Sequence, residues 1–336
     1  MKTRIEKFSD PRISRHLTTL VCGILATSCA TNLKRAAGTF AEATTSGLAT
    51  FRPISTTAYD ICTMRAESAF LKQRVSGEKP WGSPPKRSEY FADKSSGPVP
   101  EVTWQDYCGE IHKTVAGLTM IYSGLTSYAN ALKRLAGAAN VNGKTLKAVG
   151  ADAQTLAAKL LPANAPASTG AGEMLTAFQT AAPSIANLAS IVEGIIAEEE
   201  IQKSIMASDA AIQILLTQLL NYSKAVRNEA LALQSDTRVL LNWMDAKMGN
   251  PGPLEAVQYS VYAQQAEKTV RDEITLQDTY TNAVSALRSA HSAMRKAAES
   301  PSTEKEVLAL VMARAQTVED AVKDIQVIAS AKWSGK

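Results

Sequence analysis

The chain has 336 residues, of which 45% are hydrophobic, 20% are charged and 6% are aromatic. This composition excludes a disordered protein and a multi-span membrane protein, and the length allows one large domain or two modest ones. Residues 1–28 carry five basic and two acidic side chains, and the rest of the chain carries 31 basic and 30 acidic ones. Because the basic and acidic side chains are nearly equal in number, the composition excludes the basic surface that a nucleic-acid-binding protein needs.

The chain begins with a basic leader and a short apolar run. Leu17 to Ser28 reads LTTLVCGILATS, about half the length of a bilayer-spanning helix, which suits the core of a signal peptide. The stretch Leu25-Ala26-Thr27-Ser28-Cys29 resembles a bacterial lipobox, with Ala26 where that family usually has leucine. The resemblance implies cleavage before Cys29, diacylglycerol on its sulfur and a fatty acid such as palmitate on the new amino terminus. The other interpretation is a disordered basic tail leading into a buried helix.

Residues 33–75 have apolar side chains at helical spacing and are predicted to be helical in pieces. The pair Arg52-Pro53 should interrupt the helix, because proline disfavours helical geometry in the residue before it. Residues 76–100 are rich in glycine and proline and are predicted to be a loop. The two predicted stripes are Leu33, Ala36, Ala37 and Phe40, then Tyr59, Cys62, Ala66 and Phe70.

The cysteines agree with an exported protein. Cys22 would leave with the leader and Cys29 would be lipidated, so Cys62 and Cys108 remain as an even pair. In an oxidising compartment such a pair predicts a disulfide, here one that closes the 76–100 loop. The alternative is two unrelated buried thiols, since free cysteine is common in protein cores.

From residue 103 onward the chain is predicted to form long helices. Thr103 can cap the first, with Asp106 three residues on. Apolar residues then recur every seventh position, which is typical of a packed seam on one helix face. The two clearest series are Trp104, Ile111, Leu118, Leu125 and Leu132, and then Ile205, Ile212, Leu219, Val226, Leu233 and Leu240.

Three stretches of comparable length follow one another, at 103–161, 172–249 and 254–331. Breakers rich in proline and glycine separate them, and short connections make consecutive long helices antiparallel. The predicted inward residues of the last stretch are Val270, Ile274, Val284, Leu287, Met294, Val307, Leu310 or Val311, Val318, Val322 and Ile325. The sequence therefore predicts an all-α, elongated antiparallel up-down helical bundle with coiled-coil-like packing. The predicted organisation is a signal peptide (1–28), a lipid-anchored helical segment with its loop (29–100) and the long bundle (101–336).

The chain has few residues suited to catalysis or metal binding. Of its three histidines, His16 lies in the leader and His291 lies on an apolar stripe, so a core position is the better interpretation of His291. His112 follows the seam residue Ile111, and the sequence contains no HExxH, Glu-x-x-His or paired CxxC motif. Gly143-Lys144-Thr145 is interpreted as an inter-helix turn and Glu198-Glu199-Glu200 as a solvated face. We therefore expect no catalytic residue, cofactor or metal.

These patterns favour a non-catalytic envelope lipoprotein, tethered at the periplasmic face of a bacterial membrane, with the outer membrane preferred. Its expected partners are the bilayer, through the acylated N-terminus, and an unidentified protein, and self-association is left open. One alternative is a membrane-active bundle resembling α-pore-forming toxins, with Val115–Leu125 or Ile185–Ala197 as inserting regions. A third possibility is an enzyme or ligand binder with a cleft between helices, but no residue in the sequence supports it.

Overall fold

The structure is a computed structural model, and the regular structure that it describes is α-helical, so the predicted fold class is confirmed. The residues described are 32–51, 57–76, 103–137, 174, 176–187, 201–248, 253–300 and 304–333. Five long helices are α2 (Thr57–Ser76), α4 (Trp104–Leu135), α7 (Ile201–Met248), α8 (Pro253–Glu299) and α9 (Glu304–Trp333). Residues 32–51 and 176–187 are also helical.

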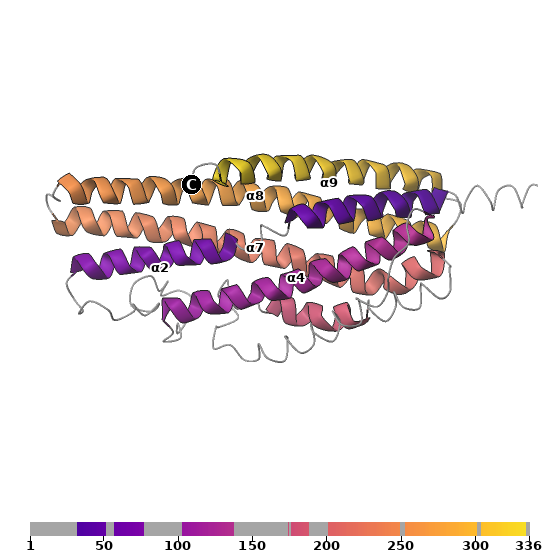
Figure 1. Ribbon diagram of the computed structural model, residues 1–336, viewed down its shortest axis with the longest axis horizontal. Coiled ribbons are helices and arrows are strands. Elements are labelled where there is room, and N and C mark those ends of the chain that lie inside the picture. Colours follow the sequence, from indigo (N-terminus) through magenta and orange to yellow (C-terminus); the bar gives the residue numbers. More distant parts are fainter. Residues whose placement is uncertain are drawn as a thin grey trace, which may run out of the picture.

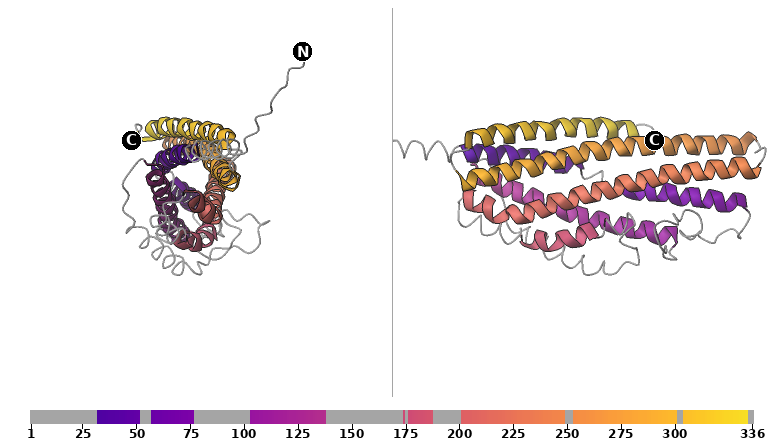
Figure 2. Two further views of the ribbon diagram at one scale, coloured as in Figure 1. Left: turned by 90° about the vertical axis from the view of Figure 1, so that its right-hand side faces the viewer. Right: turned by 180° about the vertical axis from the view of Figure 1, so that it is seen from behind.

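The helices lie side by side along one axis and form an elongated antiparallel bundle (Figure 1). Helices α7 and α8 make a hairpin along the whole length, and α9 folds back along α8. Residues 32–51 and then α2 lie along the hairpin in the direction of α7, and α4 returns against them (Figure 2). We call the end where residue 32, α7 and α9 begin the proximal end, and the end where α7 meets α8 the distal end. The 47 residues of α8 correspond to about 70 Å of helix.

The predicted seams form the core. All six residues of the α7 series, from Ile205 to Leu240, are fully buried at 0% exposure, and the α4 series from Trp104 to Leu132 is buried as well. A single apolar cluster includes side chains from residue 33 to residue 325, so the N-terminal helix packs into the same core as α7, α8 and α9. A small second cluster at the distal end consists of Leu240, Met244 and Tyr259, with Leu71 and Tyr262 against it.

The start of α4 follows the predicted capping arrangement. The Oγ1 atom of Thr103 accepts a hydrogen bond from the backbone N–H of Asp106 at 3.1 Å and donates one to its Oδ2 at 2.6 Å. This satisfies one of the N–H groups that a helix leaves unpaired at its N-terminus and places a carboxylate where the helix dipole favours it.

The predicted apolar stripe of α2 is wrong in two positions. Cys62 is buried, but Tyr59 and Phe70 are 37% and 46% exposed. The buried face passes instead through Ile61, Arg65 and neighbouring small residues, because Arg65 pairs with two carboxylates of α7 and turns this side of the helix inward. For α9 the sequence left open whether Leu310 or Val311 faces the core. Val311 is buried and Leu310 is exposed. Residues 138–173 and 188–200, part of the predicted long stretches, lie outside the described residues.

Gly117 and Gly109 of α4 give a matched pair of predictions. A Cβ on Gly117 would lie 2.4 Å from Cγ of Phe178, whereas a Cβ on Gly109 would meet nothing within 4 Å. We expect Gly117→Ala to destabilise the protein by about 1–2 kcal/mol through overpacking, and Gly109→Ala to stabilise it by up to about 1 kcal/mol through helix propensity. Urea unfolding of the two variants tests this, and equal shifts in the same direction would contradict the close helix contact.

Candidate functional site

The predicted disulfide between Cys62 and Cys108 is present, with an S–S distance of 2.05 Å. It joins α2 to α4, and both cysteines are buried. The predicted lipid-attachment residue Cys29, together with Cys22 and His16, lies outside the described residues.

Removal of the disulfide should lower stability substantially. The two cysteines are 46 residues apart, and a bridge of that span restricts the unfolded chain by about 4 kcal/mol in the chain-entropy model. We expect Cys62→Ala/Cys108→Ala to lose most of that amount in denaturant unfolding, and a reductant to bring the wild-type protein to the same midpoint. A wild-type midpoint that does not respond to full reduction would contradict this account.

One helical turn from the disulfide, an arginine is buried between two carboxylates. Arg65 of α2 is 4% exposed. Its Nη1 lies 2.5 Å from Oε2 of Glu229, and its Nε lies 2.6 Å from Oδ2 of Asp236, both on α7. Tyr107 of α4 donates a hydrogen bond to the other oxygen of Glu229 at 2.6 Å. The guanidinium lies over the Trp104 ring, 5.1 Å from its centre, which is cation–π geometry.

The charges in this cluster determine the protonation of Arg65. Burial alone would lower the pKa of Arg65, but the neighbouring charges of Glu229 and Asp236 outweigh it and raise the pKa above its ordinary value. The arginine is therefore a fixed cation. Together with the disulfide, the cluster links α2, α4 and α7 at one level of the bundle.

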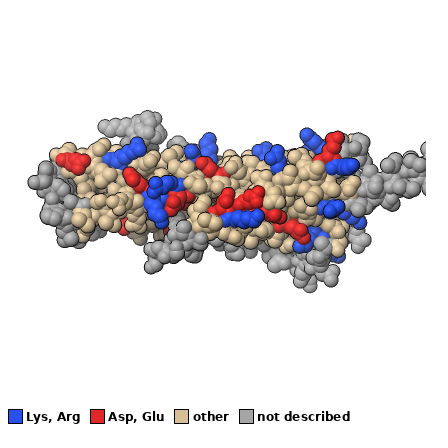
Figure 3. All heavy atoms as spheres, turned by 90° about the horizontal axis from the view of Figure 1, so that it is seen from above, with Lys and Arg blue, Asp and Glu red and all other residues tan. Residues whose placement is uncertain are grey.

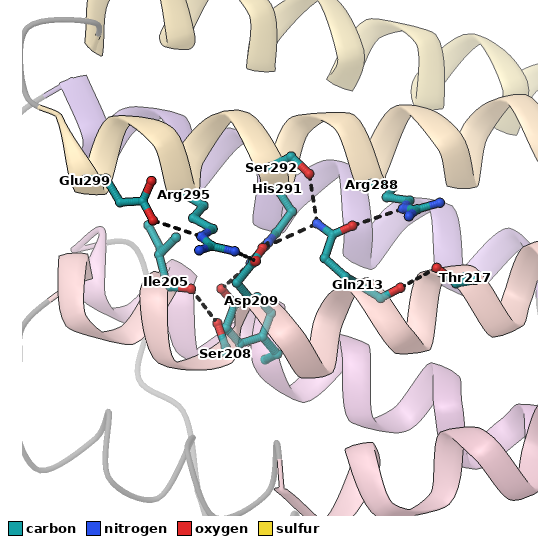
Figure 4. Close-up of polar contacts among 11 residues, drawn as sticks. Ile205, Ser208, Asp209, Gln213, Thr217, Arg288, His291, Ser292, Arg295 and Glu299 are labelled. Carbon is teal, nitrogen blue, oxygen red and sulfur yellow. Dashed lines mark hydrogen bonds and ion pairs between the residues drawn. The ribbon is translucent and has the colours of Figure 1, made fainter.

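A second buried polar cluster lies nearer the proximal end, between α7 and α8 (Figure 4). His291 of α8 is fully buried, as the apolar stripe predicted. Its Nδ1 lies 3.1 Å from Oδ1 of Asp209 on α7, and its Nε2 lies 2.8 Å from the hydroxyl of Tyr128 on α4. The Phe40 ring from the N-terminal helix makes an edge contact with the imidazole at 5.6 Å. Arg295 reaches the second oxygen of Asp209 at 2.6 Å.

The hydrogen bonds of this cluster assign its protons. A carboxylate accepts only, so Nδ1 of a neutral His291 donates to Asp209 and Nε2 accepts from Tyr128. Burial lowers the pKa of His291 against the raising effect of Asp209. Hydrogen bonds from His291 and Arg295 hold the pKa of Asp209 at about 2, although burial acts in the other direction. Burial raises the pKa of the Tyr128 hydroxyl.

These shifts predict an acid-dependent loss of stability. Because the pKa of His291 is lower in the folded protein than in the unfolded chain, the unfolded state binds the proton first as the pH falls below about 6.5. We therefore expect the free energy of unfolding to fall between pH 7.5 and pH 5. Protonation of Asp209 lowers the free energy of unfolding further, but only as the pH falls from the ordinary pKa of an aspartate toward 2. Urea unfolding at both pH values should show a smaller change for His291→Asn than for the control His112→Asn, and equal changes would contradict this assignment.

An open recess of about 450 Å³ lies on the surface beside the disulfide. His112 is exposed there and makes an edge contact with Tyr59, with ring centres 5.2 Å apart. The recess is lined by Tyr59, Gln105, Asp106, Gly109, Glu110 and His112. Among the described residues, no three His, Cys, Asp or Glu side chains are grouped so that they could hold a metal ion.

The regions considered for membrane insertion lie partly in the core. Leu118, Ile121 and Leu125 of the first region and Ile185 of the second are buried, and residues 188–197 are outside the described part. No helix in the described ranges is both long and apolar enough to cross a membrane. Gly143-Lys144-Thr145 and Glu198–Glu200 are also outside the described ranges.

The buried charges were not predicted from the sequence, although one signal for them exists. Tyr222, Glu229 and Asp236 are spaced by seven residues, so the two carboxylates continue an inward-facing series that also includes Leu215. A charge at such a position indicates a buried partner on another helix.

Comparison of the chain with protein-family models, curated proteins and solved structures found no match.

Proposed function

We propose that this protein is a non-catalytic lipoprotein of the bacterial cell envelope, tethered by an acylated Cys29, whose helical bundle is a structural or protein-interaction module. The observation that carries the proposal is the pairing of Cys62 with Cys108, because disulfides persist in exported proteins and are rare in the cytosol. It agrees with the lipobox-like stretch Leu25–Cys29, which implies export and lipidation.

The buried polar clusters support a structural role for the bundle. The Arg65 and His291 clusters each join helices far apart in sequence, and both central side chains are enclosed by the bundle. Buried charges that are paired and hydrogen-bonded in this way favour one arrangement of the helices over others. The outer surface is then available for contact with another protein.

Metabolic labelling tests the proposal. In a bacterial host, cells fed a labelled palmitate analogue should yield labelled protein in the membrane fraction. Cys29→Ala should remove the label, and Cys22→Ala, seven residues earlier in the leader, should keep it. An unlabelled wild-type protein, or a Cys29→Ala variant that is still labelled, would refute lipidation at this position.

A further inference from the structure

We propose that the proximal end of the bundle is its membrane-facing surface, and that the distal arm projects from the bilayer into the aqueous compartment. The distal arm is defined as α2 with residues 229–248 of α7 and 253–273 of α8. The inference rests on the proposed function, since it takes Cys29 as the anchor, and it adds how the bundle is placed relative to the membrane.

The chain between the anchor and the bundle is short. Three peptide units separate Cys29 from Asn32, the first described helical residue. Consecutive Cα atoms lie 3.8 Å apart, so this stretch spans at most about 11 Å. The acylated end therefore cannot be far from the start of the helix.

The helix at residues 32–51 is a fixed part of the bundle. Leu33, near its start, is already buried in the shared core. Phe40 contacts His291 of α8, and Phe51 packs edge-on against Tyr280 of α8 with ring centres 4.9 Å apart. Glu42 forms an ion pair with Lys133 of α4 at 3.2 Å. Because this helix is packed into the bundle, an anchor at Cys29 holds the whole proximal end close to the bilayer and not only the first helix.

The long side of the bundle seen in Figure 3 offers little to hold it on a membrane. Basic and acidic side chains are interspersed over this face, and the surface ion pairs of the bundle include Arg227–Asp278 and Lys323–Asp320. A side of mixed sign lacks the cluster of cations that attracts a protein to anionic lipid. The exposed apolar residues include Met206 and Ile214 of α7 and Met312 and Val327 of α9. Two of the most exposed, Val257 and Val261, lie one turn apart on α8 in the distal arm.

The arm therefore points away from the bilayer and reaches up to about 70 Å from it, the length of α8. A partner protein that binds the arm would meet it at a distance from the membrane that the rigid bundle determines.

Energy transfer to the bilayer tests this placement. The mature acylated protein, with its disulfide intact, is reconstituted in phosphatidylcholine vesicles that contain an acceptor on a lipid headgroup. A donor is attached at Lys305→Cys, at the exposed start of α9, or at Asp245→Cys, at the exposed distal part of α7. Transfer should be high from position 305 and several-fold lower from position 245.

Two outcomes would overturn the proposal while leaving lipidation intact. Equally high transfer from both positions would mean that the bundle lies flat, and equally low transfer from vesicle-bound protein would mean that it is held away from the surface. Protein absent from the vesicles would instead refute the anchor, and with it the proposed function.

A spacer variant isolates the effect of the short tether. Twenty Gly/Ser residues inserted after Thr31 have a root-mean-square length of about 25 Å. They should reduce transfer from position 305 and leave the protein on the vesicles. Unchanged transfer from position 305 would contradict the claim that the chain between Cys29 and residue 32 sets the distance.

Discussion

Leu219→Asp in α7 is expected to abolish cooperative folding. Leu219 is fully buried at the middle of the α7 series, so the substitution removes a core side chain at a cost of about 2–5 kcal/mol. It also buries a carboxylate without a cation, which costs several kcal/mol more. Together these losses are comparable to the whole stability of a typical domain, about 5–15 kcal/mol. Circular dichroism during heating should show no sharp transition.

A matched control separates the site from the type of substitution. Leu231 lies on the same helix and is 38% exposed, so Leu231→Asp should keep a sharp transition close to that of the wild-type protein. If Leu219→Asp melts like Leu231→Asp, the assignment of the α7 seam to the core is wrong.

Arg65→Met is expected to lose about 3–5 kcal/mol of unfolding free energy. Breaking a buried ion pair by removing one partner has this cost because it leaves the opposite charge buried, and here two buried carboxylates, Glu229 and Asp236, would lose their cation. Methionine fits much of the arginine volume, so packing contributes less to the loss than charge does. Urea unfolding at neutral pH measures the difference.

Two controls identify the source of that loss. Arg227→Met removes an ion pair of the same kind at the surface, where the side chains of Arg227 and Asp278 are 43% and 60% exposed, and should cost less than about 1 kcal/mol. Adding Glu229→Leu and Asp236→Leu to Arg65→Met should recover most of the stability, because an apolar cluster of similar volume can replace a buried ion pair. If the triple variant is less stable than Arg65→Met alone, the loss does not come from uncompensated charge.

The long helices could be predicted from the sequence because their signal is local and repetitive. Each heptad of α7 repeats the same evidence, and every predicted residue from Ile205 to Leu240 is buried. The cysteine pair could also be predicted, since assigning Cys22 to a leader and Cys29 to lipidation leaves only one pairing to expect. In both cases a simple pattern limits the alternatives.

The buried charges of α2 and α7 could not be predicted in the same way. A hydrophobic stripe through Tyr59 and Phe70 fits helical spacing, and an arginine is normally exposed, so Arg65 was not expected inside. Its burial depends on carboxylates 164 and 171 residues away. Which helix faces which is a tertiary property, and no local pattern contains it.

The His291 cluster lies between these cases. The stripe around Val284 correctly predicted a core position for His291, because one residue's burial follows from periodicity. Its partners Asp209 and Tyr128 are 82 and 163 residues away, and only the packing of α4, α7 and α8 brings them together. The sequence therefore predicts that the histidine is buried but not how it is hydrogen-bonded.

The intact mass of the protein extracted from membranes tests the central claim most directly. A membrane-tethered, oxidised bundle predicts a chain that begins at Cys29 and carries a diacylglycerol and one further acyl group. The mass should also lack the two thiol hydrogens that Cys62 and Cys108 lose in their disulfide. A mass that corresponds to a chain starting at Met1, or to a chain with an unmodified Cys29, would contradict the account.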